Sequence, residues 1–155
     1  MIRILFICHG NICRSTMAEF VMRYLLDGCD LKDKVAVDSK ATSSEEIGNP
    51  PHHGTVDKLR SLGIPVYSHR ASRLRKSDYD FYDYIIGMDS ANIRNIQAIT
   101  GPDRDKKVYK LMDFTDRPRD IADPWYTGDF DTTYTEIRCG CEELLNYLKH
   151  DPRVI

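Results

Sequence analysis

The sequence has almost no net charge and no long hydrophobic run, and both absences exclude classes of partner. Its 22 Lys and Arg residues against 24 Asp and Glu residues leave a formal charge of −2. General binders of nucleic acid or of anionic membranes need a surplus of basic residues, so we expect neither partner. The apolar stretch at residues 2–7 is far too short to cross a membrane and lacks the features of a signal peptide.

The sequence also lacks an even set of cysteines, internal repeats and low-complexity linkers. Its five cysteines contain no repeated C-x-x-C pair. This pattern disfavours a disulfide framework and indicates a reducing compartment, so we expect a cytoplasmic location. A chain of 155 residues has the size of one domain. We therefore expect a monomer with a single domain over residues 1–155.

The apolar patterns alternate between strand-like and helix-like segments. Such alternation is typical of an α/β fold, and we predict a three-layer sandwich with a four-stranded, mostly parallel sheet flanked by helices. Ligands of such sheets bind beyond the carboxyl ends of the strands. The expected strands are residues 2–7, 35–37, 84–88 and 108–112, and the apolar stripes of the expected helices lie within residues 17–25, 56–62, 93–99 and 130–148.

The segment between the first strand and the first helix carries the strongest chemical signal. Residues 8–15, hereafter the 8–15 loop, have the form C-x5-R-S. Gly10 and Asn11 let the backbone curl so that its N–H groups converge, and the following helix adds its positive end. We expect an anion site in which Cys8 is a nucleophilic thiolate, Arg14 grips two oxygens and Ser15 donates to the sulfur. The expected anion-binding residues are His9, Gly10, Asn11, Ile12, Cys13, Arg14 and Ser15.

The alternative interpretation of this loop is a buried cysteine in an ordinary strand-to-helix turn. A bare C-x5-R pattern arises easily by chance. The position directly after a buried strand and before an amphipathic helix, together with the Gly-Asn pair, favours the anion site.

Further motifs follow this loop in the order of a known family. Over nearly its whole length the chain resembles the low-molecular-weight protein tyrosine phosphatases, at residues 4–19, 38–43, 47–51, 68–71, 84–89 and 123–126. The resemblance implies hydrolysis of phosphotyrosine, and of aryl phosphates, through a cysteinyl-phosphate intermediate. It implies neither a metal nor a cofactor, since backbone N–H groups and Arg14 take up the developing charge.

The resemblance also implies a role for each matching residue. Cys8 would be the nucleophile, Arg14 would hold the phosphoryl group, and Asp123 would act as general acid and then as general base. The residues expected to hold the loop in shape are Asn11, Ser15, Ser43, His69 and Asp89. Trp125 and Tyr126 would line the cleft for the aromatic ring, and His9 and Glu45, which depart from the family's usual residues, would make its rim more polar.

The remaining cysteines, histidines and arginines carry weaker signals. Cys13 has two interpretations, a resolving thiol that traps oxidised Cys8 as a disulfide or a small buried residue, and the resemblance favours the first. His52 and His53 lack further ligands at metal-binding spacing and are expected at the surface. The cluster of Arg70, Arg73, Arg75 and Lys76 is either a solvated face or an attractor of acidic substrates.

Other functions on the same scaffold remain open at this point. Arsenate reduction needs further cysteines in a mobile segment, and residues 70–138 contain none. Arginine phosphatases of this family carry a threonine at the position of Ile12. A catalytically dead phosphotyrosine-binding module commonly loses the nucleophile or the acid, and a phosphocysteine carrier lacks the acid, whereas this chain keeps both Cys8 and Asp123.

Overall fold

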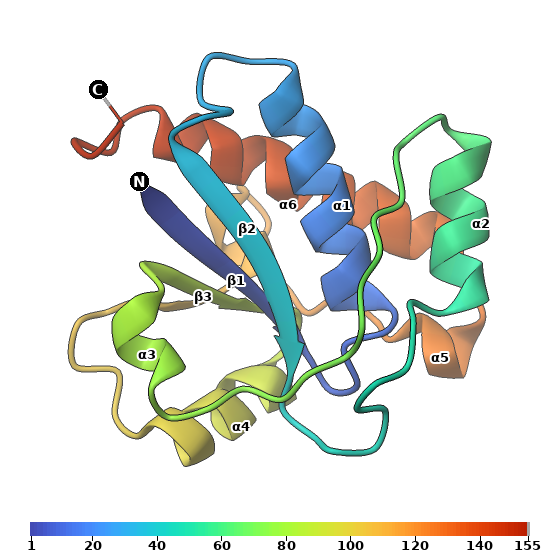
Figure 1. Ribbon diagram of the computed structural model, residues 1–155, viewed down its shortest axis with the longest axis horizontal. Coiled ribbons are helices and arrows are strands. Elements are labelled where there is room, and N and C mark those ends of the chain that lie inside the picture. Colours follow the sequence, from blue (N-terminus) through green and yellow to red (C-terminus); the bar gives the residue numbers. More distant parts are fainter. Residues whose placement is uncertain (155) are drawn as a thin grey trace.

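A four-stranded parallel sheet forms the centre of the computed structural model, which describes residues 1–154 (Figure 1). The strands lie in the order β2-β1-β3-β4, and every pairing is parallel. The predicted α/β sandwich is therefore confirmed, with a sheet that is wholly rather than mostly parallel. The strands are β1 (Ile2–Cys8), β2 (Val35–Ala41), β3 (Tyr84–Gly87) and β4 (Val108–Lys110).

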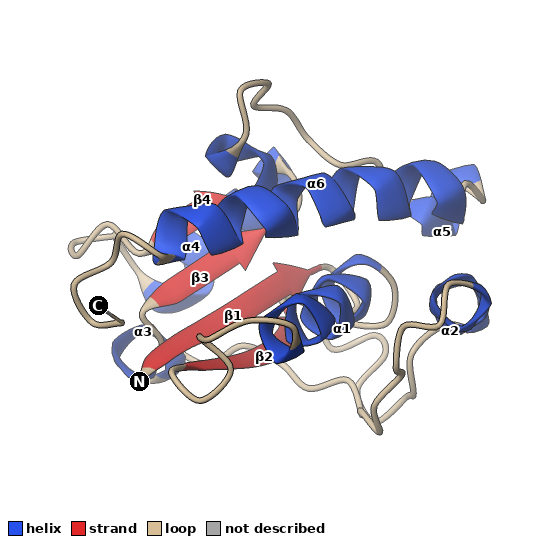
Figure 2. Cartoon of the chain, turned by 90° about the horizontal axis from the view of Figure 1, so that it is seen from above, coloured by secondary structure: helices blue, strands red, loops and turns tan. Residues whose placement is uncertain are grey.

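Helices cover both faces of the sheet. Along β1, Ile4 and Phe6 belong to a core cluster with α1 (Arg14–Asp27) and α6 (Phe130–Leu148), whereas Leu5 and Ile7 pack on the opposite face. That opposite face carries α3 (Asp78–Phe81) and α4 (Ser90–Thr100), and α2 (His53–Ser61) lies beside α1 and α6 (Figures 1 and 2). Burial on both faces explains why β1 is a nearly continuous apolar run.

Three segments differ from the predicted pattern. The strand expected over residues 108–112 ends at Lys110 and continues as a 3-10 helix, η1 (Leu111–Phe114). Two four-residue helices, α3 and α5 (Pro124–Thr127), were not expected, because four residues are too few to show a helical period. Within the described residues, no helix combines the length and apolar character needed to cross a membrane.

Candidate active site

The 8–15 loop connects the central strand to the first helix at the carboxyl edge of the sheet. Cys8 ends β1, and α1 begins at Arg14. Asn11 adopts a left-handed conformation with φ of 60°, which asparagine tolerates better than most residues. Gly10 has no positive φ. Its missing side chain instead gives room to Glu46, whose Cγ would lie 3.3 Å from a Cβ at this position.

The Cys8 sulfur receives two hydrogen bonds from its own loop. The backbone N–H of Asn11 lies 3.3 Å from Sγ, and the Ser15 hydroxyl lies 3.0 Å from it. Asn11 Nδ2 donates to Ser15 Oγ at 2.8 Å, so the Ser15 hydroxyl proton is left to point at the sulfur. Both contacts suit a sulfur that accepts hydrogen bonds, as a thiolate does.

The guanidinium of Arg14 is buried and fixed from the side away from the loop. Its Nη1 donates to Asp89 Oδ2 and to the carbonyl of Ile121, each at 2.7 Å. Asp89 is itself held because its carboxylate accepts from the N–H of Asn92 and caps α4. Arg14 Nε is buried and has no hydrogen-bond partner among the described residues, so this donor is available to an oxyanion.

Asp123 caps the short helix α5 and lines the same cavity as Cys8. Its Oδ1 accepts from the N–H of Trp125 at 3.0 Å and caps that helix, and its Oδ2 lies 3.5 Å from Arg14 Nη2. The cavity has a volume of about 90 Å³. Its lining includes Cys8 and Asp123 together with the four expected cleft residues, His9, Glu45, Trp125 and Tyr126.

Two aromatic side chains form one side of this cleft and two polar side chains form its rim. Trp125 is 57% exposed and Tyr126 is 83% exposed, so both present free ring surface to a ligand. On the rim, His9 Nε2 lies 3.1 Å from Glu45 Oε2, and both groups are largely solvated. The cleft thus combines aromatic walls with a polar rim in which His9 pairs with Glu45.

A buried hydrogen-bond network holds Asn11. Its Nδ2 donates to Ser15 and to Ser39 Oγ at 3.0 Å, and its Oδ1 accepts from His69 Nε2 at 2.9 Å and from the N–H of Ser72 at 3.3 Å. Every polar atom of the Asn11 side chain is therefore used, which fixes the left-handed turn of the loop.

Two serines contact the 8–15 loop from the segment that contains β2. Ser43 lies beyond the end of β2, and its hydroxyl donates to the carbonyl of His9 at 2.9 Å. Ser39 lies within β2, is fully buried and reaches Asn11. Ser43 thus contacts the outer part of the loop, whereas Ser39, which was not among the expected residues, holds Asn11.

A model of the low molecular weight phosphotyrosine protein phosphatase family matches residues 3–154. The chain belongs to this family. The low molecular weight protein-tyrosine-phosphatase YfkJ of Bacillus subtilis is 38% identical over 99% of this chain and 100% of that protein. PtpA of Staphylococcus epidermidis, with the same family name, is 39% identical over 97% of this chain and 96% of its own length.

The solved structures agree with this assignment. The crystal structure of YfkJ from Bacillus subtilis superposes with a TM-score of 0.94 at 38% identity, over 98% of this chain and 97% of that one. The chain is thus a hydrolase of the protein-tyrosine-phosphatase family, and the resemblance found in the sequence is confirmed.

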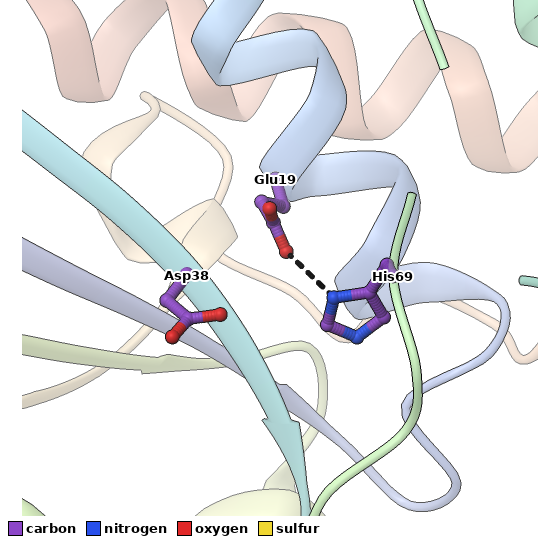
Figure 3. A group of neighbouring side chains, drawn as sticks. All are labelled: Glu19, Asp38 and His69. Carbon is purple, nitrogen blue, oxygen red and sulfur yellow. Dashed lines mark ion pairs between the residues drawn. The ribbon is translucent and has the colours of Figure 1, made fainter. Parts of the chain in front are cut away.

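Behind the 8–15 loop, Glu19 and His69 extend the hydrogen-bond network of Asn11 into the interior of the protein (Figure 3). Glu19 Oε1 accepts from Ser39 Oγ at 2.6 Å and lies 3.5 Å from His69 Nδ1, while Oε2 pairs with Arg23 at 2.8 Å. Burial raises the pKa of Glu19 above its usual range, against the opposing effect of Ser39 and Arg23. Asn11 Oδ1 can only accept, so His69 donates to it through Nε2.

Ligand atoms of Glu19, Asp38 and His69 lie within 4.8 Å of one another, as a metal site would require. Their polar atoms are already engaged within the chain, however. Asp38 accepts from the N–H of Ser39 and from the Tyr82 hydroxyl, and His69 Nε2 is used by Asn11. We therefore interpret this group as internal support for the 8–15 loop.

The structure also places Cys13, His52 and His53, which the sequence singled out. All five cysteines are free, and Cys13 is buried at the N-terminal end of α1, where it lines the same cavity as Cys8. Burial, and next the proximity of Cys8, raise the pKa of Cys13 to about 12. His53 is exposed as expected, and His52 is half-buried, with its side chain capping α2.

Proposed function

We propose that phosphotyrosine hydrolysis in this chain proceeds through a cysteinyl-phosphate on Cys8. The observation that carries the proposal is that the Cys8 thiol and the Asp123 carboxyl group line one cavity, and that the buried Arg14 guanidinium, with an unpartnered Nε, lies 3.5 Å from that carboxyl group. Cys8 accepts two hydrogen bonds at the cavity floor, and Asp123 lies on the wall. No other described residue needs to supply a nucleophile or an acid for the reaction.

In the first step, the Cys8 thiolate attacks phosphorus as the bond from phosphorus to the phenolic oxygen breaks. Asp123 gives its proton to that oxygen, so the product leaves as a phenol. Arg14 and the loop N–H groups hold the phosphoryl oxygens throughout. The sulfur–phosphorus bond that forms is the covalent intermediate.

In the second step, water replaces the sulfur. Asp123, now a carboxylate, takes a proton from the water as the water oxygen bonds to phosphorus. The sulfur–phosphorus bond breaks, inorganic phosphate is released, and Cys8 returns as a thiolate. Ser15 stabilises this leaving sulfur through the hydroxyl that points at it.

Phosphotyrosine peptides are expected to react with a kcat/KM at least about 10² times that of matched phosphoserine peptides. Cys8 is buried, and Trp125 and Tyr126 rise beside it, so a long aromatic side chain delivers its phosphate to the loop. A shorter phosphoserine would bring the peptide backbone against the rim first, and a misplacement of about 1 Å already costs about 10²-fold. Steady-state kinetics on the matched peptides measure the ratio.

The same peptide panel separates the competing functions. Comparable values for phosphoserine and phosphotyrosine would contradict the deep-cleft account. Faster release of phosphate from phosphoarginine peptides would favour arginine phosphatase activity, although Ile12 stands where those enzymes carry a threonine. Turnover of arsenate would favour the reductase.

Acidic residues beside the phosphotyrosine are expected to lower kcat/KM, because the carboxylate of Glu45 on the rim repels them. Glu45→Gln should relieve that effect.

Ser39→Ala is expected to lower kcat by about tenfold and to destabilise the protein by about 1–3 kcal/mol. The substitution leaves one proton of Asn11 and one oxygen of Glu19 without partners in a buried site. Ser43→Ala is the matched control, because its hydroxyl is only half-buried and bonds one carbonyl. Thermal unfolding and kinetics should rank Ser39 above Ser43, and the reverse order would contradict the network described above.

Mild peroxide is expected to inactivate the enzyme reversibly by forming a Cys8–Cys13 disulfide. A thiolate oxidises before a thiol, so Cys8 becomes the sulfenic acid, which the Cys13 sulfur then attacks with loss of water. Peptide mapping should find the disulfide, and added thiol should restore activity. Irreversible Cys8 sulfinic acid with unmodified Cys13 is the contradicting result, and Cys13→Ala should convert reversible into irreversible loss.

The proposal also covers the domain organisation, the substrates, the oligomeric state and the location of the enzyme. One phosphatase domain over residues 1–155 is supported by the match of the family over residues 3–154. The substrates we propose are phosphotyrosine proteins or peptides, with no nucleic-acid or membrane partner and with the enzyme acting as a monomer. A cytoplasmic location is supported by five cysteines that all remain free thiols.

A further inference from the structure

His52 joins the wall of the cleft to the 8–15 loop. Its backbone N–H donates to the carbonyl of Ile12 at 2.8 Å, so the residue is tied directly to the loop. Its side chain lies next to Trp125, a cleft residue, with ring centroids 5.6 Å apart and planes at 80°. His52 itself does not line the cavity, so any effect on substrate would act through Trp125.

The His52 ring is held from two further sides. It stacks on Phe130 of α6 at 5.3 Å with an interplanar angle of 15°, and on His53 at 4.2 Å. Gly54 permits this packing, because a Cβ there would come within 2.4 Å of the Phe130 ring. The ring therefore sits where α2, α5 and α6 meet.

The hydrogen bonding of His52 defines its protonation state. Nδ1 accepts from the N–H of Gly54 at 3.0 Å and caps α2. An acceptor nitrogen carries no proton, so the bonded ring is neutral with its proton on Nε2. Protonation of Nδ1 would set two N–H groups against each other and break the cap.

We propose that His52 is a positioning residue that holds Trp125, and through it the cleft wall next to Asp123, only while its imidazole is neutral. The ring supports the aromatic wall and caps α2 through Nδ1, while the backbone N–H ties the same residue to the 8–15 loop. Its protonated form loses the hydrogen bond from Gly54, and with it the fixed orientation of the ring beside the indole. The wall is therefore ordered above the pKa of His52 and loosened below it.

The charges around His52 agree with this direction. Burial and then His53 lower the pKa of His52, while Glu46 from the preceding loop acts in the opposite sense. Of the helices packed against the ring, α5 is capped by Asp123 and α6 by Asp129. Helix α6 also carries Asp131, which pairs with Lys58 of α2 at 2.8 Å. We expect protonation below the usual histidine value of about 6.5.

The single tryptophan of the chain makes the proposal measurable without any substrate. Trp125 is that residue, so intrinsic tryptophan fluorescence reports only on the cleft wall. A protonated imidazole quenches an adjacent indole, so emission of the intact protein should fall as the pH drops, with a midpoint below about 6.5. His52→Phe keeps a stacked ring but removes the titrating nitrogen, and the transition should disappear.

A matched control and a second variant complete the test. His53→Gln should keep the transition and move its midpoint upward, because the charge of His53 lowers the pKa of His52. His52→Asn retains a helix-capping acceptor but loses the ring, and it too should lack the transition. A transition that persists in both His52 variants, or is absent from the parent, overturns the proposal.

The kinetic part of the test rests on the proposed phosphatase function, whereas the fluorescence part does not. For p-nitrophenyl phosphate, His52→Asn should raise KM about three- to tenfold with little change in kcat, as expected for loss of an aromatic contact in the wall. Inhibition by inorganic phosphate, which contacts the loop alone, should stay unchanged. A fall in kcat with weaker phosphate inhibition would instead show a purely structural role, and a fluorescence transition without phosphatase activity would overturn only the proposed function.

Discussion

Cys8→Ser is expected to reduce turnover of p-nitrophenyl phosphate by more than about 10⁴-fold, the scale on which loss of other enzymic nucleophiles acts. A serine hydroxyl has no accessible anion at neutral pH, so the attack on phosphorus is lost. The two donors that meet the sulfur, from Asn11 and Ser15, remain to bond the new hydroxyl. The phosphate site should therefore survive the substitution.

Two measurements separate the nucleophile from the fold in this variant. Calorimetric titration with inorganic phosphate should give a dissociation constant close to that of the parent. Cys139→Ser is a matched control, because this cysteine is exposed on α6 and should tolerate the same change with unaltered turnover. Turnover of Cys8→Ser within tenfold of the parent would contradict the assignment of Cys8.

Asp123→Asn is expected to slow aryl phosphates with basic leaving groups by about 10²–10⁴-fold, and p-nitrophenyl phosphate far less. A basic phenolate leaves poorly without a proton, whereas p-nitrophenolate needs little help. Asparagine is also a good helix cap, so the bond to the N–H of Trp125, and with it α5, should be preserved. The loss then reflects the proton rather than the position of the helix.

The dependence of kcat/KM on leaving-group pKa measures this effect across a series of aryl phosphates. Asp129→Asn is the matched control, because Asp129 caps the neighbouring helix α6 in the same manner and does not line the cavity. It should leave the dependence unchanged. Equal slowing of good and poor leaving groups by Asp123→Asn would mean that Asp123 only shapes the segment around α5.

The centre of the site was predictable because it is local in sequence. The strand, the C-x5-R-S pattern and the helix follow one another directly, so the placement of Cys8 and Arg14 at one sheet edge needed no long-range information. Asn11 was expected to tolerate the left-handed region, and it does adopt it. Asp123 depended on the family resemblance, because no local pattern brings it to a loop more than a hundred residues earlier.

The outer parts of the site could not be predicted in the same way. The register of β2 against β1 places Ser39 opposite Phe6, from where its side chain reaches Asn11. Ser43 lies beyond the end of β2 and reaches His9 instead. The sequence does not specify this register, so it could not show which serine contacts Asn11. The sequence predicted this strand only over residues 35–37, whereas β2 continues to Ala41 and so includes Ser39. His52 acquires its role from Phe130 and Trp125, two residues distant in sequence, which no spacing rule connects.

Capture of the covalent intermediate tests the central claim most directly. Asp123→Asn lacks the base that activates water, but p-nitrophenolate leaves without much help from an acid. Rapid quenching after mixing this variant with ³²P-labelled p-nitrophenyl phosphate should therefore trap phosphate on the enzyme. We predict that mapping locates this phosphate on Cys8 alone, and that the double variant with Cys8→Ser retains none. Phosphate on another residue such as Ser15, or turnover with no covalent phosphate at all, would contradict the account.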